Sequence, residues 1–234
     1  MLEVNSITVK YGELTAIKDL SLRVSQGEIV ALLGANGAGK STTLSAICGL
    51  LPVLEGSIVF KGKPITNVKP NKIVDMKLSM VPEGKHLFPR LSAEENLILG
   101  AYSADHAQAR ERLEHVYSLF PPFLGERRRN RADRFSGGEQ QMIAIARGLM
   151  SNPDLLMIDE PSQGLMPTMV LKIFQILKEI NRKGVTILLV EQRVKEALEL
   201  ADRGYILQNG RIALEGRSED LMKSGMVKKA YLGM

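Results

Sequence analysis

The sequence contains no tryptophan, and its five tyrosines and six phenylalanines are few for 234 residues. Proteins that bind single-stranded nucleic acid stack the bases on aromatic side chains, so this scarcity argues against that class. The single cysteine, Cys48, cannot form an internal disulfide, which excludes a disulfide-bonded scaffold. Because nothing near the N-terminus resembles a basic and apolar signal peptide, we expect the reducing cytoplasm as the compartment.

Long hydrophobic runs are also missing, since no stretch approaches the roughly 18 apolar residues that a membrane-spanning helix needs. Hydrophobic residues nevertheless make up 44% of the chain and charged residues 24%, which excludes intrinsic disorder and predicts a sizeable core. The length favours one core with an inserted or appended subdomain. The net charge of +5 permits an anionic partner, such as a nucleotide, nucleic acid or a membrane surface, without choosing among them.

The hydrophobic pattern predicts the elements of the first part of the chain. Alternation over residues 7–10 and 20–24 favours antiparallel strands, and the apolar run at 28–33 favours a buried central strand. A helix is expected at 40–50, a strand at 57–60, and a short helix that runs into a strand at 73–80.

From about residue 94 to 150 the spacing of apolar residues is helical, which predicts an inserted helical subdomain. Strands and helices then alternate, with strands at 155–158 and 185–190 on either side of a helix at 170–180. The dipeptide Asn209-Gly210 between two apolar runs predicts a β-hairpin. This alternation indicates an α/β fold with a mostly parallel sheet covered by helices.

A phosphate-binding loop is predicted between the strand at 28–33 and the helix at 40–50. Residues 34–41, Gly-Ala-Asn-Gly-Ala-Gly-Lys-Ser, match the pattern G-x-x-x-x-G-K-[ST] in the strand, loop and helix context that the motif requires. Its glycines let backbone N–H groups turn toward phosphate oxygens, Lys40 adds a positive charge at the β and γ positions, and the Ser41 hydroxyl is a ligand for Mg²⁺. The residues therefore predict a nucleoside triphosphate site.

The apolar strand at 155–158 is followed by two acids, Asp159 and Glu160. A nucleotide site of this type requires a carboxylate beside the metal, and Asp159 has the position for it. Glu160, one residue further, points differently and is the candidate general base that polarises the attacking water. Alone, two acids at the end of a strand would more often cap the next turn, so this interpretation depends on the phosphate loop.

Residues 135–141, Phe-Ser-Gly-Gly-Glu-Gln-Gln, precede a helix with an apolar stripe. Ser136 is a candidate cap for that helix, and Gly137 and Gly138 leave backbone N–H groups open to an anion. Taken alone, this pattern is most often a cap and a turn. Beside a complete phosphate loop, it predicts a second phosphate site that serves the γ-phosphate of a neighbouring molecule.

The order of phosphate loop, Ser-Gly-Gly-Glu-Gln signature and Asp-Glu strand resembles the ATP-binding-cassette ATPases over essentially the whole chain. The resemblance implies a P-loop ATPase core with an N-terminal antiparallel β subdomain and an inserted α-helical subdomain. The core would comprise residues 1–93 and 151–234, and the helical signature subdomain about 94–150. The resemblance also implies ATP and Mg²⁺ as cofactors and a head-to-tail dimer, in which each ATP meets one subunit's phosphate loop and the other's signature.

The resemblance assigns roles to individual residues, with Glu160 as the catalytic residue and Tyr11 as the aromatic residue that stacks on adenine. The expected ATP contacts within one subunit are Tyr11, Gly34, Ala35, Asn36, Gly37, Ala38, Gly39, Lys40, Ser41, Thr42 and Gln192. The expected contacts across the dimer are Ser136, Gly137, Gly138 and Glu139, and the expected metal ligands are Ser41, Asp159 and Glu83.

Three departures from the family pattern indicate which group of cassette ATPases this chain resembles most. Glu83 stands where most cassettes carry a glutamine, Gln192 stands where most carry a histidine, and residues 161–166 lack the usual aspartate of the dimer-contact loop. A glutamine donates a hydrogen bond but holds no proton charge near neutral pH. Together with the runs at 201–205 and 230–233, these features are similar to one of the paired ATPases of branched-chain amino acid importers. Urea and short-amide importers have similar ATPases, so the substrate stays open.

The importer resemblance implies several partners: two membrane permeases docked near residues 83–97, a second related ATPase or a second copy of this chain, and indirectly an extracytoplasmic binding protein. It places the chain at the inner face of the cell membrane.

The rival function is that of a soluble cassette that acts on ribosomes or DNA. Such proteins usually carry a second cassette or long coiled coils, so no nucleic acid is expected as a partner. A cassette that clamps ATP without turnover is disfavoured by the presence of both Asp159 and Glu160. The arginines at 127–134 are expected to form a solvated loop.

Overall fold

The computed structural model describes residues 1–228, and the contacts within it define two compact units. The first unit comprises Met1–Ile73 and the chain from Thr186 onward, and the second comprises Val74–Val185. The run at 230–233, which contributed to the importer resemblance, lies outside the described residues. The predicted subdomain boundaries near residues 93 and 150 stay a prediction.

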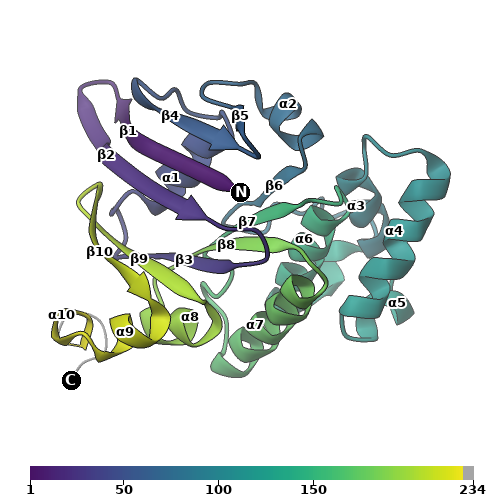
Figure 1. The fold of residues 1–234 in the computed structure, drawn as a ribbon. Coiled ribbons are helices and arrows are strands. Elements are labelled where there is room, and N and C mark those ends of the chain that lie inside the picture. The colour runs from purple at the N-terminus through teal and green to yellow at the C-terminus, as the bar shows by residue number, and fades with distance from the viewer. Residues whose placement is uncertain (229–234) are drawn as a thin grey trace. The chain divides into compact units, whose positions relative to one another are not determined.

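The first unit contains an antiparallel sheet with the strand order β2-β1-β4-β5. Its strands are β1 (Leu2–Tyr11), β2 (Leu14–Val24), β4 (Glu55–Phe60) and β5 (Lys63–Pro64). Figure 1 shows β1 between β2 and β4, and it pairs with both in antiparallel register. Leu2 and Val4 of β1 are fully buried, as alternation along a strand predicts, and Ile7 and Val9 are buried beyond an irregularity in the pairing between Val4 and Ile7. The predicted antiparallel strands near the N-terminus are therefore confirmed.

A second group of strands in the first unit comprises β3 (Ile29–Leu33), β8 (Thr186–Glu191), β9 (Arg203–Gln208) and β10 (Arg211–Arg217). β3 pairs in parallel with β8 on one side and with β9 on the other, while β10 is antiparallel to β9. Every residue of β3 and β8 is buried, as their continuous apolar runs predict for central parallel strands. Asn209 and Gly210 have φ angles of 49° and 74°, which confirms the predicted hairpin turn.

The helices that belong to the first unit are α1 (Lys40–Ile47), α8 (Val194–Leu200), α9 (Ser218–Lys223) and α10 (Gly225–Val227), and α2 (Pro70–Asp75) spans the boundary between the units. α1 ends before residue 50, where the prediction placed its end, because Gly49 has a left-handed φ of 69°. A Cβ atom on Gly49 would lie 2.0 Å from the carbonyl oxygen of Val68. Cys48 follows α1 directly and is buried, and this burial raises the pKa of its thiol to about 12.

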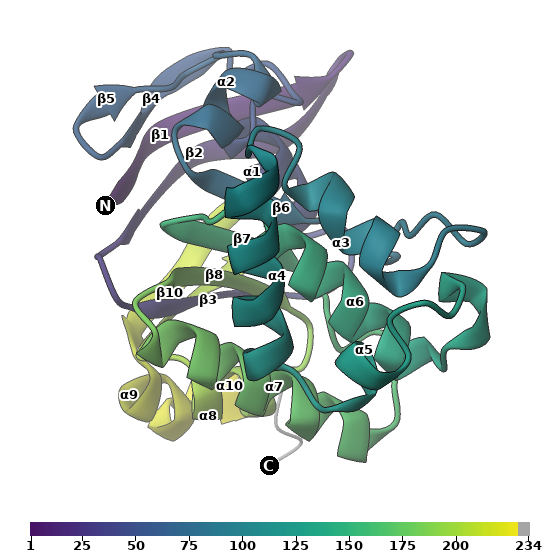
Figure 2. The same ribbon diagram turned by 90° about the vertical axis from the view of Figure 1, so that its right-hand side faces the viewer.

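The second unit contains two parallel strands, β6 (Leu78–Val81) and β7 (Leu155–Asp159). Its helices are α3 (Ala93–Gly100), α4 (His106–Leu119), α5 (Phe123–Glu126), α6 (Gly137–Leu149) and α7 (Pro167–Arg182). α6 contacts both strands as well as α3 and α7, so it is the central helix of this unit (Figure 2). A Cβ atom on Gly100 would lie 2.0 Å from the carbonyl oxygen of Arg147, because α3 and α6 approach each other closely there.

The predicted helical spacing at 94–150 and the strand at 155–158 are confirmed. The stripe of Val170, Phe174 and Leu177 along α7 is buried core. Parallel strands, helices and an antiparallel sheet together make an α/β fold, as predicted. None of the helices in residues 1–228 combines the length and the apolar character that crossing a membrane requires.

Candidate nucleotide site

The phosphate loop connects β3 to α1 in the first unit. Gly34 begins the loop at a point where β9 passes close by, since a Cβ atom on Gly34 would lie 2.4 Å from the carbonyl oxygen of Leu207. Gly39 ends the loop with a φ of 106°, which residues with a side chain rarely adopt. The glycines at both ends of the motif are therefore a steric requirement of this loop.

Hydrogen bonds fix the backbone of the phosphate loop. The N–H group of Ala38 donates to the carbonyl oxygen of Ala35 at 3.2 Å, and the N–H group of Gly210 in the β9–β10 hairpin donates to the carbonyl oxygen of Ala38 at 2.9 Å. The Thr43 hydroxyl donates to the carbonyl oxygen of Gly39 at 2.9 Å. Because the loop is already ordered, little conformational entropy is lost when it binds a ligand.

Lys40 is the first residue of α1 and is only 4% exposed. Its Nζ atom donates a hydrogen bond to the carbonyl oxygen of Ala35 at 3.0 Å, so the ammonium group folds back over the loop. An ammonium group carries three donors in rotatable positions, which suits it to several phosphate oxygens at once. The positive charge of the motif therefore lies over the phosphate loop, and its contact with phosphate stays a prediction.

Ser41 and Thr42 follow Lys40 on the first turn of α1. The Thr42 Oγ1 atom lies 3.4 Å from the hydroxyl oxygen of Tyr11, which brings the predicted adenine-stacking residue to the start of this helix. Tyr11 is 50% exposed, so its ring is open to a ligand rather than packed away against the sheet.

Gln192 directly follows β8 and is exposed. In the parallel pairing of β3 with β8, Glu191 lies opposite Leu33, the residue before Gly34. The carboxyl ends of neighbouring parallel strands meet at one edge of a sheet, and ligands of open α/β folds bind there. The first unit therefore brings Tyr11, the phosphate loop and Gln192 to the same region.

Asp159 and Glu160 lie at the end of β7 in the second unit, and they are 5% and 8% exposed. Glu160 has a φ of 43°, in the left-handed region that residues other than glycine seldom occupy. Its Oε2 atom accepts a hydrogen bond from the Nε2 atom of Gln163 at 3.5 Å. Backbone strain of this kind gathers at functional sites, and no feature of the sequence predicted it.

Glu83 follows β6 closely and is exposed. β6 and β7 pair in parallel with Val81 opposite Ile158, so Glu83 leaves the same edge as Asp159 and Glu160. These carboxylates are hard oxygen donors, which Mg²⁺ prefers. Mg²⁺ commonly takes one or two carboxylates and completes its shell with water and phosphate, so it needs no larger cluster. Residues 1–228 contain no group of three or more histidine, cysteine or acidic side chains placed to hold a metal.

The signature residues form their own group at the N-terminus of α6. The Ser136 Oγ atom accepts from the Glu139 N–H group at 3.3 Å, and the Glu139 carboxylate accepts from the Ser136 N–H group at 2.8 Å. This reciprocal capping box confirms the predicted cap. The N–H groups of Gly137 and Gly138, the first two of the helix, have no hydrogen-bond partner within residues 1–228. Gly137 is exposed and Gly138 is buried beside Met169, and each N–H group keeps a donor that an anion can accept from.

Glu139 has a second partner, Arg127, whose Nη1 atom lies 2.7 Å from the Glu139 Oε1 atom. The Arg127 guanidinium also stacks over the ring of Phe135, at 4.3 Å from the ring centroid. Two further arginines of this loop form ion pairs, Arg128 with Glu94 and Arg131 with Asp133. The loop at 127–134 is exposed, as predicted, but these three arginines are held in ion pairs rather than simply solvated. Arg127 and Glu139 are too far apart in the sequence to be recognised as a pair.

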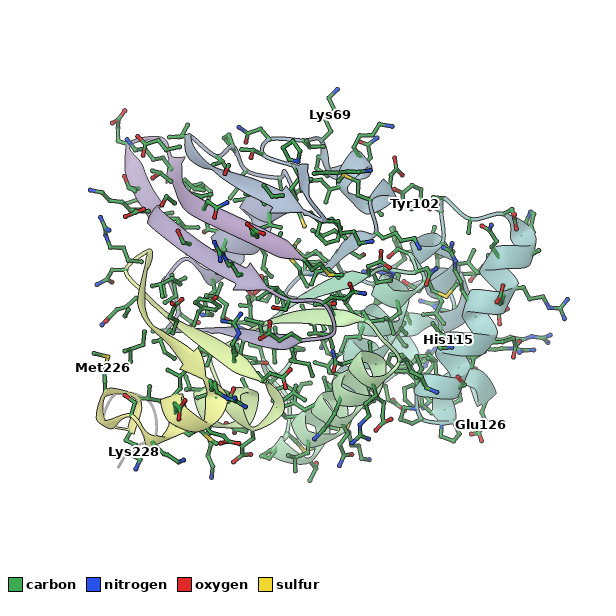
Figure 3. The ribbon with its side chains drawn as sticks, in the orientation of Figure 1. Lys69, Tyr102, His115, Glu126, Met226 and Lys228 are labelled. Carbon is green, nitrogen blue, oxygen red and sulfur yellow. The ribbon has the colours of Figure 1, made fainter. Side chains whose placement is uncertain are left out.

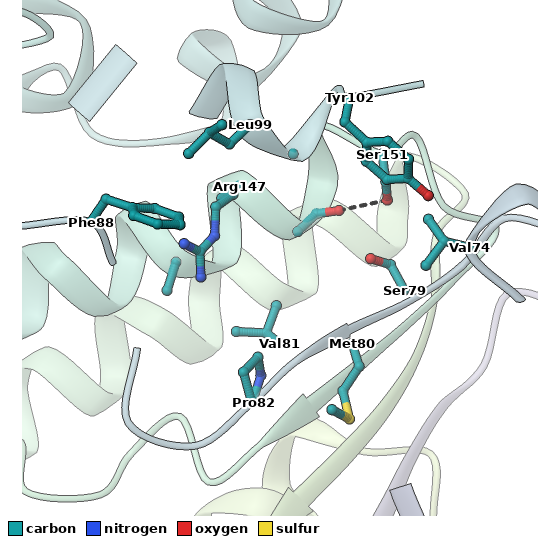
Figure 4. A pocket seen from close by; sticks show the side chains of 13 residues that line it. Val74, Ser79, Met80, Val81, Pro82, Phe88, Leu99, Tyr102, Arg147 and Ser151 are labelled. Atoms are coloured by element: carbon teal, nitrogen blue, oxygen red, sulfur yellow. Dashed lines mark hydrogen bonds between the residues drawn. The ribbon is translucent and has the colours of Figure 1, made fainter. Parts of the chain in front are cut away.

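A groove of about 300 Å³ lies within the second unit (Figure 4). Its lining includes Val81, Phe88, Leu99, Tyr102 and Arg147. Three of these, Phe88, Leu99 and Tyr102, are large apolar side chains that stay exposed, and Tyr102 is also labelled in Figure 3. Exposed apolar side chains gathered at one concave place typically mark a surface that another protein covers. Phe88 of this groove belongs to the segment at 83–97, near which the membrane permeases are predicted to dock.

Comparisons with known proteins agree with these features. The family model described as ABC transporter matches residues 17–163. The chain is 45% identical over 233 residues to BraG of Pseudomonas aeruginosa, a high-affinity branched-chain amino acid transport ATP-binding protein, and the match covers 100% of both chains. The ADP conformation of MJ1267, an ATP-binding cassette of an ABC transporter, superposes with a TM-score of 0.90 at 27% identity and covers 100% of this chain and 99% of that one. A dimeric post-hydrolysis structure of the cassette MJ0796, bound to ADP and Pi, gives a TM-score of 0.81 at 27% identity and covers 93% of this chain and 99% of that one.

Proposed function

Because this chain belongs to the ABC transporter family, we propose that it binds and hydrolyses ATP as the energising subunit of an importer for branched-chain amino acids. The observation that carries the ATP chemistry is the phosphate loop, whose end glycines are sterically required and over which the Lys40 ammonium is folded. The choice of branched-chain amino acids rests on the 45% identity to BraG over the full length of both chains.

In this proposal the phosphate loop, Gly34 to Thr42, binds the phosphates, Tyr11 stacks on adenine, and Gln192 donates a hydrogen bond to the γ-phosphate. Ser41 and Asp159 hold Mg²⁺, with Glu83 as a further oxygen donor, and the bound ion supplies neutralising charge on the phosphates.

The catalytic role in the proposed reaction belongs to Glu160. Its carboxylate accepts a proton from the water molecule whose oxygen attacks the γ-phosphorus, while the bond from that phosphorus to the bridging oxygen of ADP breaks. Inorganic phosphate and ADP are the products.

ATP binding closes a dimer in which the signature residues Ser136 to Glu139 of one subunit meet the nucleotide of the other. Two observations support this part of the proposal: the similar cassette MJ0796 has been solved as a dimer with ADP and Pi, and the N–H groups of Gly137 and Gly138 lack partners within residues 1–228. The second subunit is either another copy of this chain or a related ATPase.

The groove of the second unit is the proposed docking site for a helix of a membrane permease. Its exposed apolar residues, Phe88, Leu99 and Tyr102, would be covered by the apolar face of such a helix. Two permeases on a closed dimer would place this chain at the inner face of the membrane, and a binding protein on the other side would deliver the substrate. Dimer closure then moves the permease helices, and hydrolysis resets them.

An uptake assay tests the substrate of the proposed importer. Cells that lack this chain are expected to lose uptake of labelled leucine, isoleucine and valine at low external concentrations, because the permeases are no longer energised. The wild-type chain restores uptake, and the Glu160→Gln variant does not. Urea uptake serves as the control; a loss of urea uptake together with normal leucine uptake would contradict the assignment.

A further inference from the structure

We propose that Lys85 is a further phosphate-binding residue of the signature group. Its ammonium group, together with the N–H groups of Gly137 and Gly138, binds the γ-phosphate of an ATP molecule held by the phosphate loop of a second subunit. This inference rests on the proposed function, because it requires the head-to-tail dimer.

The position of the Lys85 side chain carries the inference. Its Nζ atom lies 3.4 Å from the point that a Cβ atom on Gly137 would occupy, so the ammonium group stands directly beside the first residue of α6. Gly137 and Gly138 carry the N–H groups that lack partners within residues 1–228. No salt bridge or hydrogen bond of the Lys85 ammonium is found in the same part of the chain.

The Lys85 ammonium group and the N-terminus of α6 are both positive, and an anion placed between them is stabilised by both. A cation beside the N-terminus of a helix is repelled by the positive end of the helix dipole unless an anion lies between them. The nearest acid of the motif, Glu139, is already engaged by the Ser136 N–H group and by the Arg127 guanidinium. An ammonium group and two N–H groups therefore offer donors at one place without an acceptor, and a phosphate group, with several acceptor oxygens, matches them.

The backbone of the loop that carries Lys85 is held against α6 itself. The Nη1 atom of Arg147, a residue of α6, donates to the carbonyl oxygen of His86 at 2.7 Å, and its Nη2 atom donates to that of Lys85 at 3.0 Å. Lys85 and His86 both have left-handed backbones, with φ angles of 66° and 46°. The guanidinium of Arg147 thus fixes Lys85 on the same helix that presents the signature.

The test uses the full chain in a Glu160→Gln background, in which ATP-bound dimers accumulate. Dimer formation is measured by analytical ultracentrifugation as the concentration of ATP with Mg²⁺ is raised. Adding Lys85→Ala is expected to raise the ATP concentration for half-maximal association about tenfold, because a charge-assisted contact to phosphate is lost in each site. Lys85→Arg keeps the charge and is expected to stay within about twofold of the parent.

The controls separate this role from a structural one. Lys172→Ala removes an exposed lysine of the same unit and is expected to leave the association midpoint unchanged. ADP binding by the monomer is expected to be the same with and without Lys85→Ala, because the proposed contact is made only across the dimer. An association midpoint that does not move in Lys85→Ala, while the parent still dimerises, would contradict the role of Lys85 alone. A parent that fails to associate at any ATP concentration would contradict a dimer of two copies of this chain, and the role of Lys85 in that dimer with it.

Discussion

Replacing Glu160 with glutamine is expected to lower steady-state ATP hydrolysis by about 10²- to 10⁴-fold, the usual contribution of a general base. Glutamine has nearly the same size as glutamate and keeps one acceptor oxygen, which can still accept from Gln163, but its amide cannot take the proton of the attacking water. Glu160 is only 8% exposed and has a left-handed backbone, so a replacement of nearly equal size is the one expected to disturb the local structure least. ATP binding is therefore expected to persist, and ATP-bound dimers should accumulate.

Phosphate release and sedimentation measure these two effects of Glu160→Gln separately. Glu111→Gln is the matched control, since it makes the same substitution at an exposed residue of α4 in the same unit. The control is expected to hydrolyse ATP like the wild-type chain. Wild-type hydrolysis rates in Glu160→Gln would show that another group activates the water, and the assignment of the base would be wrong.

Replacing Lys40 with alanine is expected to weaken ATP binding by about 10- to 100-fold, because a charge-assisted hydrogen bond to phosphate is lost from a nearly buried position. The substitution also removes the hydrogen bond from the Nζ atom to the carbonyl oxygen of Ala35. Methionine fills most of the space of lysine but carries no charge and no donor. Lys40→Met therefore measures the loss of the ammonium group without the loss of side-chain volume that Lys40→Ala also causes.

Equilibrium titration with ATP measures the affinity of both Lys40 variants, and thermal unfolding confirms that they are folded. Lys69→Ala is the control in the same unit, because Lys69 is exposed and Figure 3 shows its side chain extending away from the ribbon. Its affinity for ATP is expected to match that of the wild-type chain. Wild-type affinity in Lys40→Ala and Lys40→Met would mean that the loop does not bind the phosphates.

Local rules of sequence predicted much of this fold. The continuous apolar runs of β3 and β8 identified buried parallel strands, and Asn209-Gly210 identified the β9–β10 hairpin, because these patterns depend on neighbouring residues only. The phosphate loop was predicted because its glycines stand at fixed positions in the sequence. Gly34 approaches Leu207 closely and Gly39 has a left-handed φ, so the structure requires glycine at both positions of the motif.

Contacts between segments that are far apart in the sequence could not be predicted from it. The ion pair between Arg127 and Glu139 and the approach of Lys85 to Gly137 depend on how loops pack against α6, which no spacing rule encodes. The left-handed backbone of Glu160 was missed because a strand that ends in two acids gives no sign of it. The predicted end of α1 lies a few residues too late because the helix pattern continues past Ile47, while the left-handed backbone of Gly49 stops the helix before it.

The central claim is that this chain is the ATP-hydrolysing subunit of a membrane importer. The most direct test isolates the chain from gently solubilised membranes of its own cell and identifies every protein that co-purifies with it. We predict the recovery of two polytopic permeases, together with either a second cassette ATPase or further copies of this chain alone. Recovery of ribosomal proteins or nucleic acid without any membrane protein would contradict the transporter assignment.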